Sequence, residues 1–165
     1  MKMKYFSQHA NRVDGWRTCG TTSLAMALSA LGINVTPDTL TRRAYALGRD
    51  VTETGVIRVL AAEYGVEDLY TDRGTLKGIK DAIDKKRPVI LRGNFTGSGH
   101  VIAVEGYDKN GLKVKDPNGE WFWDGYDTNL TGDNLHYSFA MIAKNCSPES
   151  INSPQHIWFH QLYKK

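Results

Sequence analysis

Cys19 is the residue of this sequence whose setting best suits nucleophilic chemistry. It directly precedes Gly20 and a run whose apolar residues repeat at helical spacing, so we expect a helix that begins at or next to Cys19 and ends at Gly32. A thiolate attacks carbonyl carbons far better than a thiol, and a helix N-terminus lowers the pKa of a cysteine placed there. A structural cysteine would more often fall within the apolar stripe, as Met26 and Leu28 do. We therefore predict that Cys19 is a nucleophile.

His100 is the best-placed general base among the five histidines. It follows Gly97-Ser98-Gly99 and opens the apolar segment Val101–Val104, which has the composition of a strand. A histidine at the mouth of a central strand is held rigidly and can face a cleft, whereas the alternative is a capping or surface histidine. No comparable setting surrounds the other histidines, which are His9, His136, His156 and His160.

Asp116 is the candidate for the group that orients the imidazole. The residues Asp108–Gly111 predict a tight hairpin, because Asn-Gly tolerates positive φ, and this hairpin joins the strand of His100 to a strand at Leu112–Val114. His100 and Asp116 then lie near the same end of neighbouring strands. The sequence Asp116-Pro117-Asn118-Gly119 also makes a turn by itself. Beside a nucleophile and a base, the catalytic interpretation is the stronger one.

An acyl-transfer site also needs hydrogen-bond donors for the oxyanion that develops on the carbonyl. The backbone N–H of Cys19, at the start of a helix, is one such donor. A side-chain amide from the segment before the helix could supply another, and Gln8 is our candidate.

The spacing of apolar residues changes along the chain, from a helical pattern in the first half to a strand pattern in the second. Three further helices are expected at Thr36–Gly48, Thr54–Gly65 and Thr75–Lys86, and Pro88 prevents the last from continuing. Strands are expected afterwards at Val89–Leu91, Val101–Val104 and Leu112–Val114, with further strands at the sheet edge at Tyr137–Ile142 and Ile157–Phe159. Asn145–Pro154 reads as a polar loop. Helices first and strands afterwards predict an α+β fold.

Length and composition favour an ordinary soluble protein. The 165 residues suit a single domain, 1–165, and we expect a monomer. No apolar run is long enough for membrane insertion, and the N-terminus lacks the apolar core of a signal peptide. The net charge of +3 comes with no nucleic-acid motif. The two cysteines, Cys19 and Cys146, could pair, but the lack of a secretion signal argues against a disulfide.

These residues together resemble the C39-like peptidases, a papain-fold family that includes bacteriocin-leader processing domains. The matching pieces run from residue 5 to about 119, and the specific ones are Gly15–Met26, Ser98–Asp108 and Lys115–Gly119. The resemblance implies a papain-like fold, with the N-terminal helices packed on an antiparallel sheet, and a Cys-His-Asp mechanism. By this resemblance Gln8 is the oxyanion residue, Cys19 the nucleophile, His100 the base and Asp116 its orienting partner.

The resemblance also bears on the substrate. Bacteriocin-processing domains normally precede a membrane exporter, and no transmembrane segment follows here, so the chain is similar to free-standing, phage-encoded members. We therefore expect an endolysin that is made in the cytoplasm, released by a holin, and cleaves peptide or amide bonds of peptidoglycan. The alternatives are an intracellular peptidase that processes a double-glycine type leader peptide, and a non-catalytic binding module of the same fold.

Two further sets of residues are weaker candidates. Trp16, Gly99, Trp121 and Trp123 are expected to line the substrate cleft, although the aromatic group at 121–123 could instead belong to the core. Oxygen-bearing side chains alternate as in the opening of a calcium loop at Asp127, Asn129, Thr131 and Asp133. A plain polar loop is the alternative there, because Ser138 stands where such a loop carries a carboxylate. No other cofactor is expected.

Overall fold

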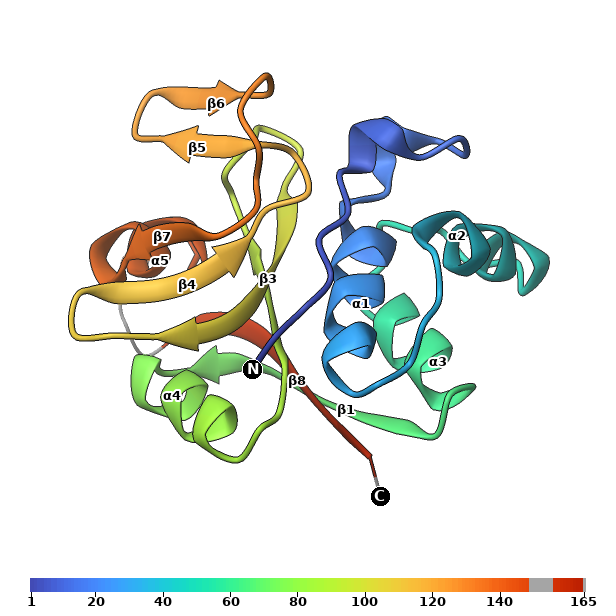
Figure 1. Ribbon diagram of the computed structural model, residues 1–165, viewed down its shortest axis with the longest axis horizontal. Coiled ribbons are helices and arrows are strands. Elements are labelled where there is room, and N and C mark those ends of the chain that lie inside the picture. Colours follow the sequence, from blue (N-terminus) through green and yellow to red (C-terminus); the bar gives the residue numbers. More distant parts are fainter. Residues whose placement is uncertain (149–155, 165) are drawn as a thin grey trace.

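A computed structural model describes residues 1–148 and 156–164 and shows one six-stranded antiparallel sheet with helices on both faces (Figure 1). The helices are α1 (Cys19–Ala30), α2 (Pro37–Ala46), α3 (Val56–Ala62), α4 (Leu76–Asp84) and α5 (Phe139–Asn145), with short 3-10 turns η1 (Gln8–Ala10) and η2 (Gly15–Arg17). The sheet has the order β1 (Val66–Gly74), β8 (Ile157–Lys164), β2 (Val89–Gly93), β3 (His100–Tyr107), β4 (Gly111–Lys115) and β7 (Leu135–Ser138). A separate hairpin is formed by β5 (Glu120–Phe122) and β6 (Gly125–Asp127).

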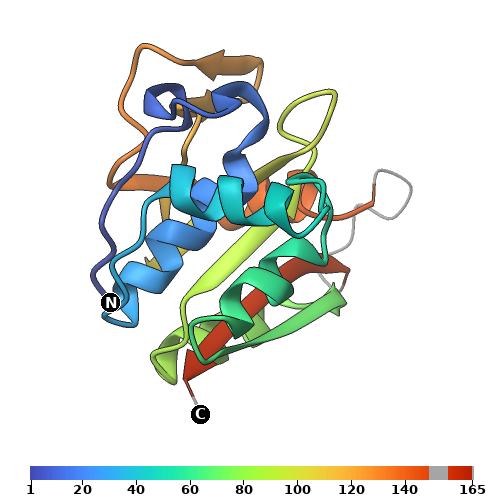
Figure 2. The same cartoon turned by 90° about the vertical axis from the view of Figure 1, so that its right-hand side faces the viewer.

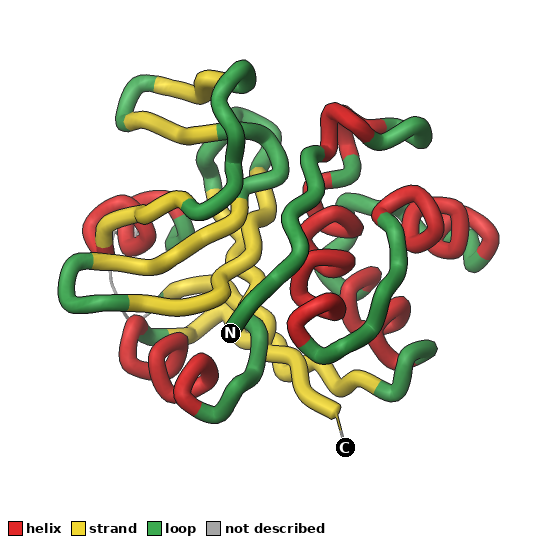
Figure 3. The backbone as a smooth tube through the Cα atoms, in the orientation of Figure 1, coloured by secondary structure: helices red, strands yellow, loops and turns green. Residues whose placement is uncertain are grey.

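Two apolar cores lie on opposite faces of the sheet. Helices α1, α2 and α3 cover one face, where Leu28 and Leu60 pack against Ile90 of β2. Helices α4 and α5 cover the other face, where Ile79 and Ile142 pack with the apolar strand side chains that point to that side. Figure 3 shows the strands passing between these two groups of helices, and Figure 2 shows α1, α2 and α3 in front of the sheet. The predicted α+β architecture, with N-terminal helices on an antiparallel sheet, is confirmed.

The four expected helices are present, and local signals explain their ends. Thr36 and Thr75 each accept a hydrogen bond from a backbone N–H of the first turn, which caps α2 and α4. Gly32, with φ of 77°, follows the end of α1 in the left-handed conformation that ends helices at low cost. Among the described residues, no helix is both long and apolar enough to span a membrane.

The later part of the chain departs from the expected order. Strand β1 was not anticipated, and the run Tyr137–Ile142 is not one strand, because Ser138 ends β7 and its side chain caps α5 by accepting from the Met141 N–H. β7 does lie at the sheet edge as expected, but β8 does not, since it pairs with both β1 and β2. Of the expected polar loop Asn145–Pro154, residues 149–154 lie outside the described residues.

Candidate active site

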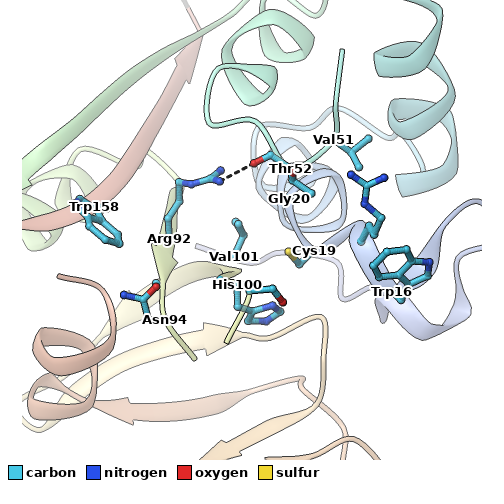
Figure 4. Close-up of a pocket in the computed structure, with 14 residues that line it drawn as sticks. Trp16, Cys19, Gly20, Val51, Thr52, Arg92, Asn94, His100, Val101 and Trp158 are labelled. Atoms are coloured by element: carbon cyan, nitrogen blue, oxygen red, sulfur yellow. Dashed lines mark hydrogen bonds between the residues drawn. The ribbon is translucent and has the colours of Figure 1, made fainter. Parts of the chain in front are cut away.

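Cys19 is the first residue of α1, as the sequence predicts. Its side chain is half-buried, and Gly20 beside it passes close to the carbonyl oxygen of Val51, which an added Cβ would meet at 3.3 Å. The thiol thus stands at the positive end of a helix dipole, with the chain held closely around it. In Figure 4 the sulfur points into a pocket between α1 and the sheet.

His100 and Asp116 are brought together by the antiparallel pairing of β3 with β4. His100 is the first residue of β3 and Asp116 directly follows β4. The two side chains meet across this end of the ladder, with 2.8 Å between His100 Nε2 and Asp116 Oδ1, and both are buried. Because Nε2 faces the carboxylate, Nδ1 is the nitrogen left for the thiol. This is the hydrogen-bond geometry expected from the sequence.

The Asp116 carboxylate is the acceptor for several donors besides His100. Its Oδ2 accepts from the hydroxyls of Tyr126 at 2.7 Å and Tyr137 at 2.9 Å, and its Oδ1 accepts from the Asn118 backbone N–H at 3.0 Å. Burial and the charge of Asp116 raise the pKa of both tyrosine hydroxyls, so both remain protonated and donate. These donors hold the carboxylate in place.

The Cys19 thiol and the His100 imidazole favour each other's charged forms. Burial by itself would raise the pKa of the thiol, but the hydrogen bond and positive charge of His100, with smaller contributions from the Val101 amide and Arg92, lower it below its ordinary value. Burial likewise opposes the imidazolium, but Asp116 and Cys19 outweigh it and raise the pKa of His100. Both shifts favour a thiolate–imidazolium pair.

Further hydrogen bonds tie α1 to the sheet and hold the loop that carries Asp116. Ser23, one turn into α1, donates from its hydroxyl to the carbonyl of Val101 at 3.0 Å. The loop of Asp116 is held from the other side, where its N–H donates to the Gly132 carbonyl at 2.8 Å and the Tyr5 hydroxyl donates to the Asp116 carbonyl at 3.2 Å. The nucleophile and its partners thus sit on elements that are fastened to one another.

Gln8 is in the segment before Cys19 and contacts the loop that follows Asp116. Its backbone N–H donates to the Pro117 carbonyl at 2.9 Å, and its own carbonyl lies directly against Gly15 in η2, where a Cβ would approach to 2.6 Å. The Gln8 side chain is buried, and its Oε1 has no hydrogen-bond partner. An oxyanion donor would have to use Nε2 rather than Oε1, so the catalytic role of Gln8 stays a prediction.

The thiol and the imidazole line a pocket of about 420 Å³ (Figure 4). Two of the expected substrate-binding residues, Trp16 and Gly99, line it as well, and Trp16 is 77% exposed. Trp121 was expected in the substrate cleft but lies in the core. It is only 6% exposed, and its indole N–H donates to the Phe95 carbonyl at 3.2 Å. Trp123 is 54% exposed but lies outside this pocket, on the β5–β6 hairpin.

Several residues of the site were not anticipated from the sequence. Arg92 and Trp158 line the pocket from β2 and β8, and Thr52 lines it from the loop before α3. The antiparallel pairing of β2 with β3, which places Arg92 opposite Val101, is the signal that could have indicated Arg92. No local pattern marks Tyr126 or Tyr137, since their hydroxyls reach Asp116 from separate strands.

The loop proposed for calcium is held by contacts of its own. Asp127 Oδ1 accepts from the Asn129 N–H at 2.9 Å, Thr131 Oγ1 accepts from the Asp133 N–H at 3.2 Å, and the Asp133 carboxylate accepts from the Lys115 ammonium. In the described parts of the chain, no three His, Cys, Asp or Glu side chains gather as a metal site. Because the Lys115 ammonium already pairs with the Asp133 carboxylate, these contacts favour the plain polar loop.

Cys19 and Cys146 are both free thiols. Cys146 is fully buried, and burial, together with the charge of Asp116, raises its pKa. A protonated, enclosed thiol is a poor nucleophile, so the two cysteines are expected to differ strongly in reactivity.

The sequence model of the Peptidase_C39 like family matches residues 1–145 of this chain. No curated protein is significantly similar to the chain in sequence. Solved structures share its fold at low identity. The peptidase domain of Streptococcus ComA, a bifunctional ABC transporter of a quorum-sensing pathway, is 19% identical, covers 94% of this chain and 96% of its own, and has a TM-score of 0.62.

Two other structures are similar over nearly their whole length. A putative C39-like peptidase from Bacillus anthracis is 15% identical over 99% of this chain and 95% of its own, with a TM-score of 0.64. A double-glycine motif protease from an AMS/PCAT transporter, solved with a leader peptide, is 16% identical over 97% and 91%, with a TM-score of 0.59. At these identities the likeness shows a common fold, and function has to be argued from the site.

Proposed function

The chain belongs to the Peptidase_C39 like family, a family of cysteine peptidases, and we propose that it hydrolyses peptide bonds with Cys19 as the nucleophile. The observation that carries this proposal is the position of His100, which hydrogen-bonds Asp116 through Nε2 and interacts with the Cys19 thiol on its other side. Nucleophile, base and orienting group then stand in the order that acyl transfer requires.

The mechanism follows from these contacts. The Cys19 thiolate attacks the carbonyl carbon of the scissile bond, and the backbone N–H of Cys19 with the Gln8 amide stabilises the oxyanion. The His100 imidazolium gives its proton to the leaving amine, which leaves an acyl-enzyme thioester. A water molecule, deprotonated by His100, then attacks the thioester; the carboxylic acid product departs and the Cys19–His100 pair is restored.

A precursor peptide that carries a leader sequence of the double-glycine type is one candidate substrate, which the chain would process inside the cell. This candidate is supported by the structural relatives, one of which was solved with a leader peptide bound. It predicts cleavage of linear peptides that contain a double-glycine sequence and no release of fragments from cell walls.

Peptidoglycan is the second candidate, and an endolysin role with holin-mediated release would follow from it. Its support is the mildly basic charge of the chain, which favours approach to an anionic cell wall. It predicts that the protein releases stem-peptide fragments from purified peptidoglycan.

The test compares three proteins on both kinds of substrate, with fragments identified by mass spectrometry. The unmodified chain is expected to cleave one of them, Cys19→Ala to lose at least about a thousandfold in rate, and Cys146→Ser to retain full activity. Fragment release by Cys19→Ala at the unmodified rate would overturn the mechanism. Equal alkylation of Cys19 and Cys146 by iodoacetamide would instead favour a non-catalytic binding module.

A further inference from the structure

Two arginines line the pocket beside the thiol, and their surroundings differ. Arg17 is paired with Asp50, with 2.8 Å between Nη2 and Oδ2, so its charge is already matched within the protein. Arg92 has no such match, because no Asp or Glu side chain in the described parts of the chain forms an ion pair with it. Its electrostatic neighbours are Cys19 and Tyr70. The pocket therefore contains one guanidinium whose carboxylate partner is missing.

The position of Arg92 is fixed by the sheet and by one hydrogen bond. It lies on β2 opposite Val101, the neighbour of His100, and its Nη2 donates to the Thr52 carbonyl at 3.0 Å across the pocket (Figure 4). A guanidinium has five N–H donors, so most remain unused. Among the described residues, the buried side-chain atoms without partners do not include any nitrogen of Arg92. The donors that Thr52 does not use are therefore accessible to solvent, and Arg92 lines the pocket.

The walls around Arg92 suit an extended peptide side chain. Trp158 lies on one side of it, Thr52 lies on the other with Val51 beyond, and all three line the same pocket (Figure 4). Apolar walls of this kind pack against methylene groups, while the guanidinium can bind a carboxylate at their end through two parallel hydrogen bonds. Partial burial strengthens such a contact because water screens it less.

We propose that Arg92 is a specificity-determining residue that binds a carboxylate of the peptide substrate beside the scissile bond. This inference rests on the proposed peptidase function and adds a substrate class to it: peptides that carry an acidic group near the cleaved bond. The carboxylate belongs either to an L-glutamyl side chain in an ordinary peptide or to the free α-carboxylate of a γ-linked D-glutamyl residue, as in cell-wall stem peptides. The shared chemistry is a carboxylate on a short flexible stem.

The test uses peptidyl acyloxymethyl ketones, in which the Cys19 thiolate displaces the acyloxy carboxylate and forms a thioether. Probes with L-Glu, L-Gln or L-Lys, and with γ-linked D-Glu or its α-amide, at each of the two positions before the reactive group are compared by the rate of Cys19 modification. Each rate is divided by that for iodoacetamide, which carries no peptide and so reports thiol reactivity alone.

The unmodified chain is expected to react about tenfold or more faster with an acidic probe than with its neutral counterpart. Arg92→Gln should remove this preference, Arg92→Glu should shift it toward the Lys probe, and Arg92→Lys should retain part of it. Arg87→Gln removes a positive charge that contacts Gln161 outside the pocket, and should leave the preference unchanged. The faster of the two acidic probes identifies the source of the carboxylate.

Two results would overturn the inference: an acidic preference absent from the unmodified chain, or one that persists in Arg92→Gln. Failure of the proposed function looks different, because Cys19 would then react with iodoacetamide no faster than Cys146 and with none of the peptidyl probes.

Discussion

His100 lies between two acidic partners, the Cys19 thiol and the Asp116 carboxylate, and each stabilises its imidazolium form. The pKa of Cys19 is lowered and that of His100 is raised, so the pH range of the ion pair is widened at both ends. The lower limit is set by protonation of the thiolate and the upper limit by loss of the imidazolium proton.

The pH dependence of Cys19 reactivity follows from these directions. As pH falls, alkylation of Cys19 by iodoacetamide should persist below the range in which a free thiol stops reacting; as pH rises, peptide cleavage should decline through the raised pKa of His100. Rates measured across the pH range check both limits. Asp116→Asn removes a charge that raises the pKa of His100, and should move the upper limit to lower pH. An alkylation rate of Cys19 that depends on pH as that of a free thiol does would contradict the ion pair.

Tyr126 is a positioning residue that acts through Asp116. Its hydroxyl donates to Asp116 Oδ2 at 2.7 Å, and its ring contacts the edge of the His100 ring with centroids 5.4 Å apart. Tyr126→Phe keeps the ring and removes one donor, so kcat/KM should fall about three- to tenfold, with a shifted upper pH limit. Tyr107→Phe removes a hydroxyl that donates to Asp84 on the surface, and should leave the pH profile unchanged. Equal effects of the two variants would exclude a role through Asp116.

The loop around Gly132 acts at the scale of an element, because it holds the end of β4 that carries Asp116. A Cβ at Gly132 would overlap the Asp116 carbonyl oxygen, so Gly132→Ala must displace this loop. We expect a loss of about 1–3 kcal/mol of unfolding free energy together with most of the activity. Gly55→Ala is the matched control, since nothing lies within 4 Å of its Cβ position. Urea unfolding and cleavage rates check this, and an active, stable Gly132→Ala would show that the loop has room.

The loop from Asp127 to Asp133 is the candidate calcium-binding element. Because the Lys115 ammonium already contacts Asp133, calcium would have to displace it. We therefore expect the same melting temperature with calcium as with EDTA. A clear rise with calcium, absent in Asp127→Asn, would instead support the calcium loop.

At the scale of the whole molecule, the nucleophile and its base lie on opposite sides of the interface between the helices and the sheet. Cys19 belongs to the helices on one face, whereas His100 and Asp116 belong to the sheet, and Figure 1 shows α1 alongside β3. The enhanced reactivity of Cys19 therefore requires both parts to be folded and docked.

One cooperative transition should govern both cysteines. In increasing urea, the excess reactivity of Cys19 should disappear at the midpoint at which the buried Cys146 becomes available for labelling. Mass spectrometry of residue-specific labelling measures both. Loss of Cys19 reactivity well before exposure of Cys146 would mean that the helices separate from the sheet before the core unfolds.

The sequence alone determines those features whose signals are local. A cysteine at a helix start, a histidine at a strand mouth and an aspartate beyond an Asn-Gly hairpin are each fixed by neighbouring residues. The hairpin limits how far apart His100 and Asp116 can lie. This is why the positions of Cys19, His100 and Asp116 in the fold, and the four N-terminal helices, could be predicted.

The tertiary structure decides what depends on pairing between distant segments. β8 lies between β1 and β2, Tyr126 and Tyr137 meet on Asp116, and Arg92 faces the thiol without a carboxylate of its own. These contacts depend on how separate strands and loops are arranged around one another, and an apolar run such as Ile157–Phe159 fits an edge or a central strand equally well. Composition and period are properties of one segment, whereas a neighbour in space is a property of the whole fold.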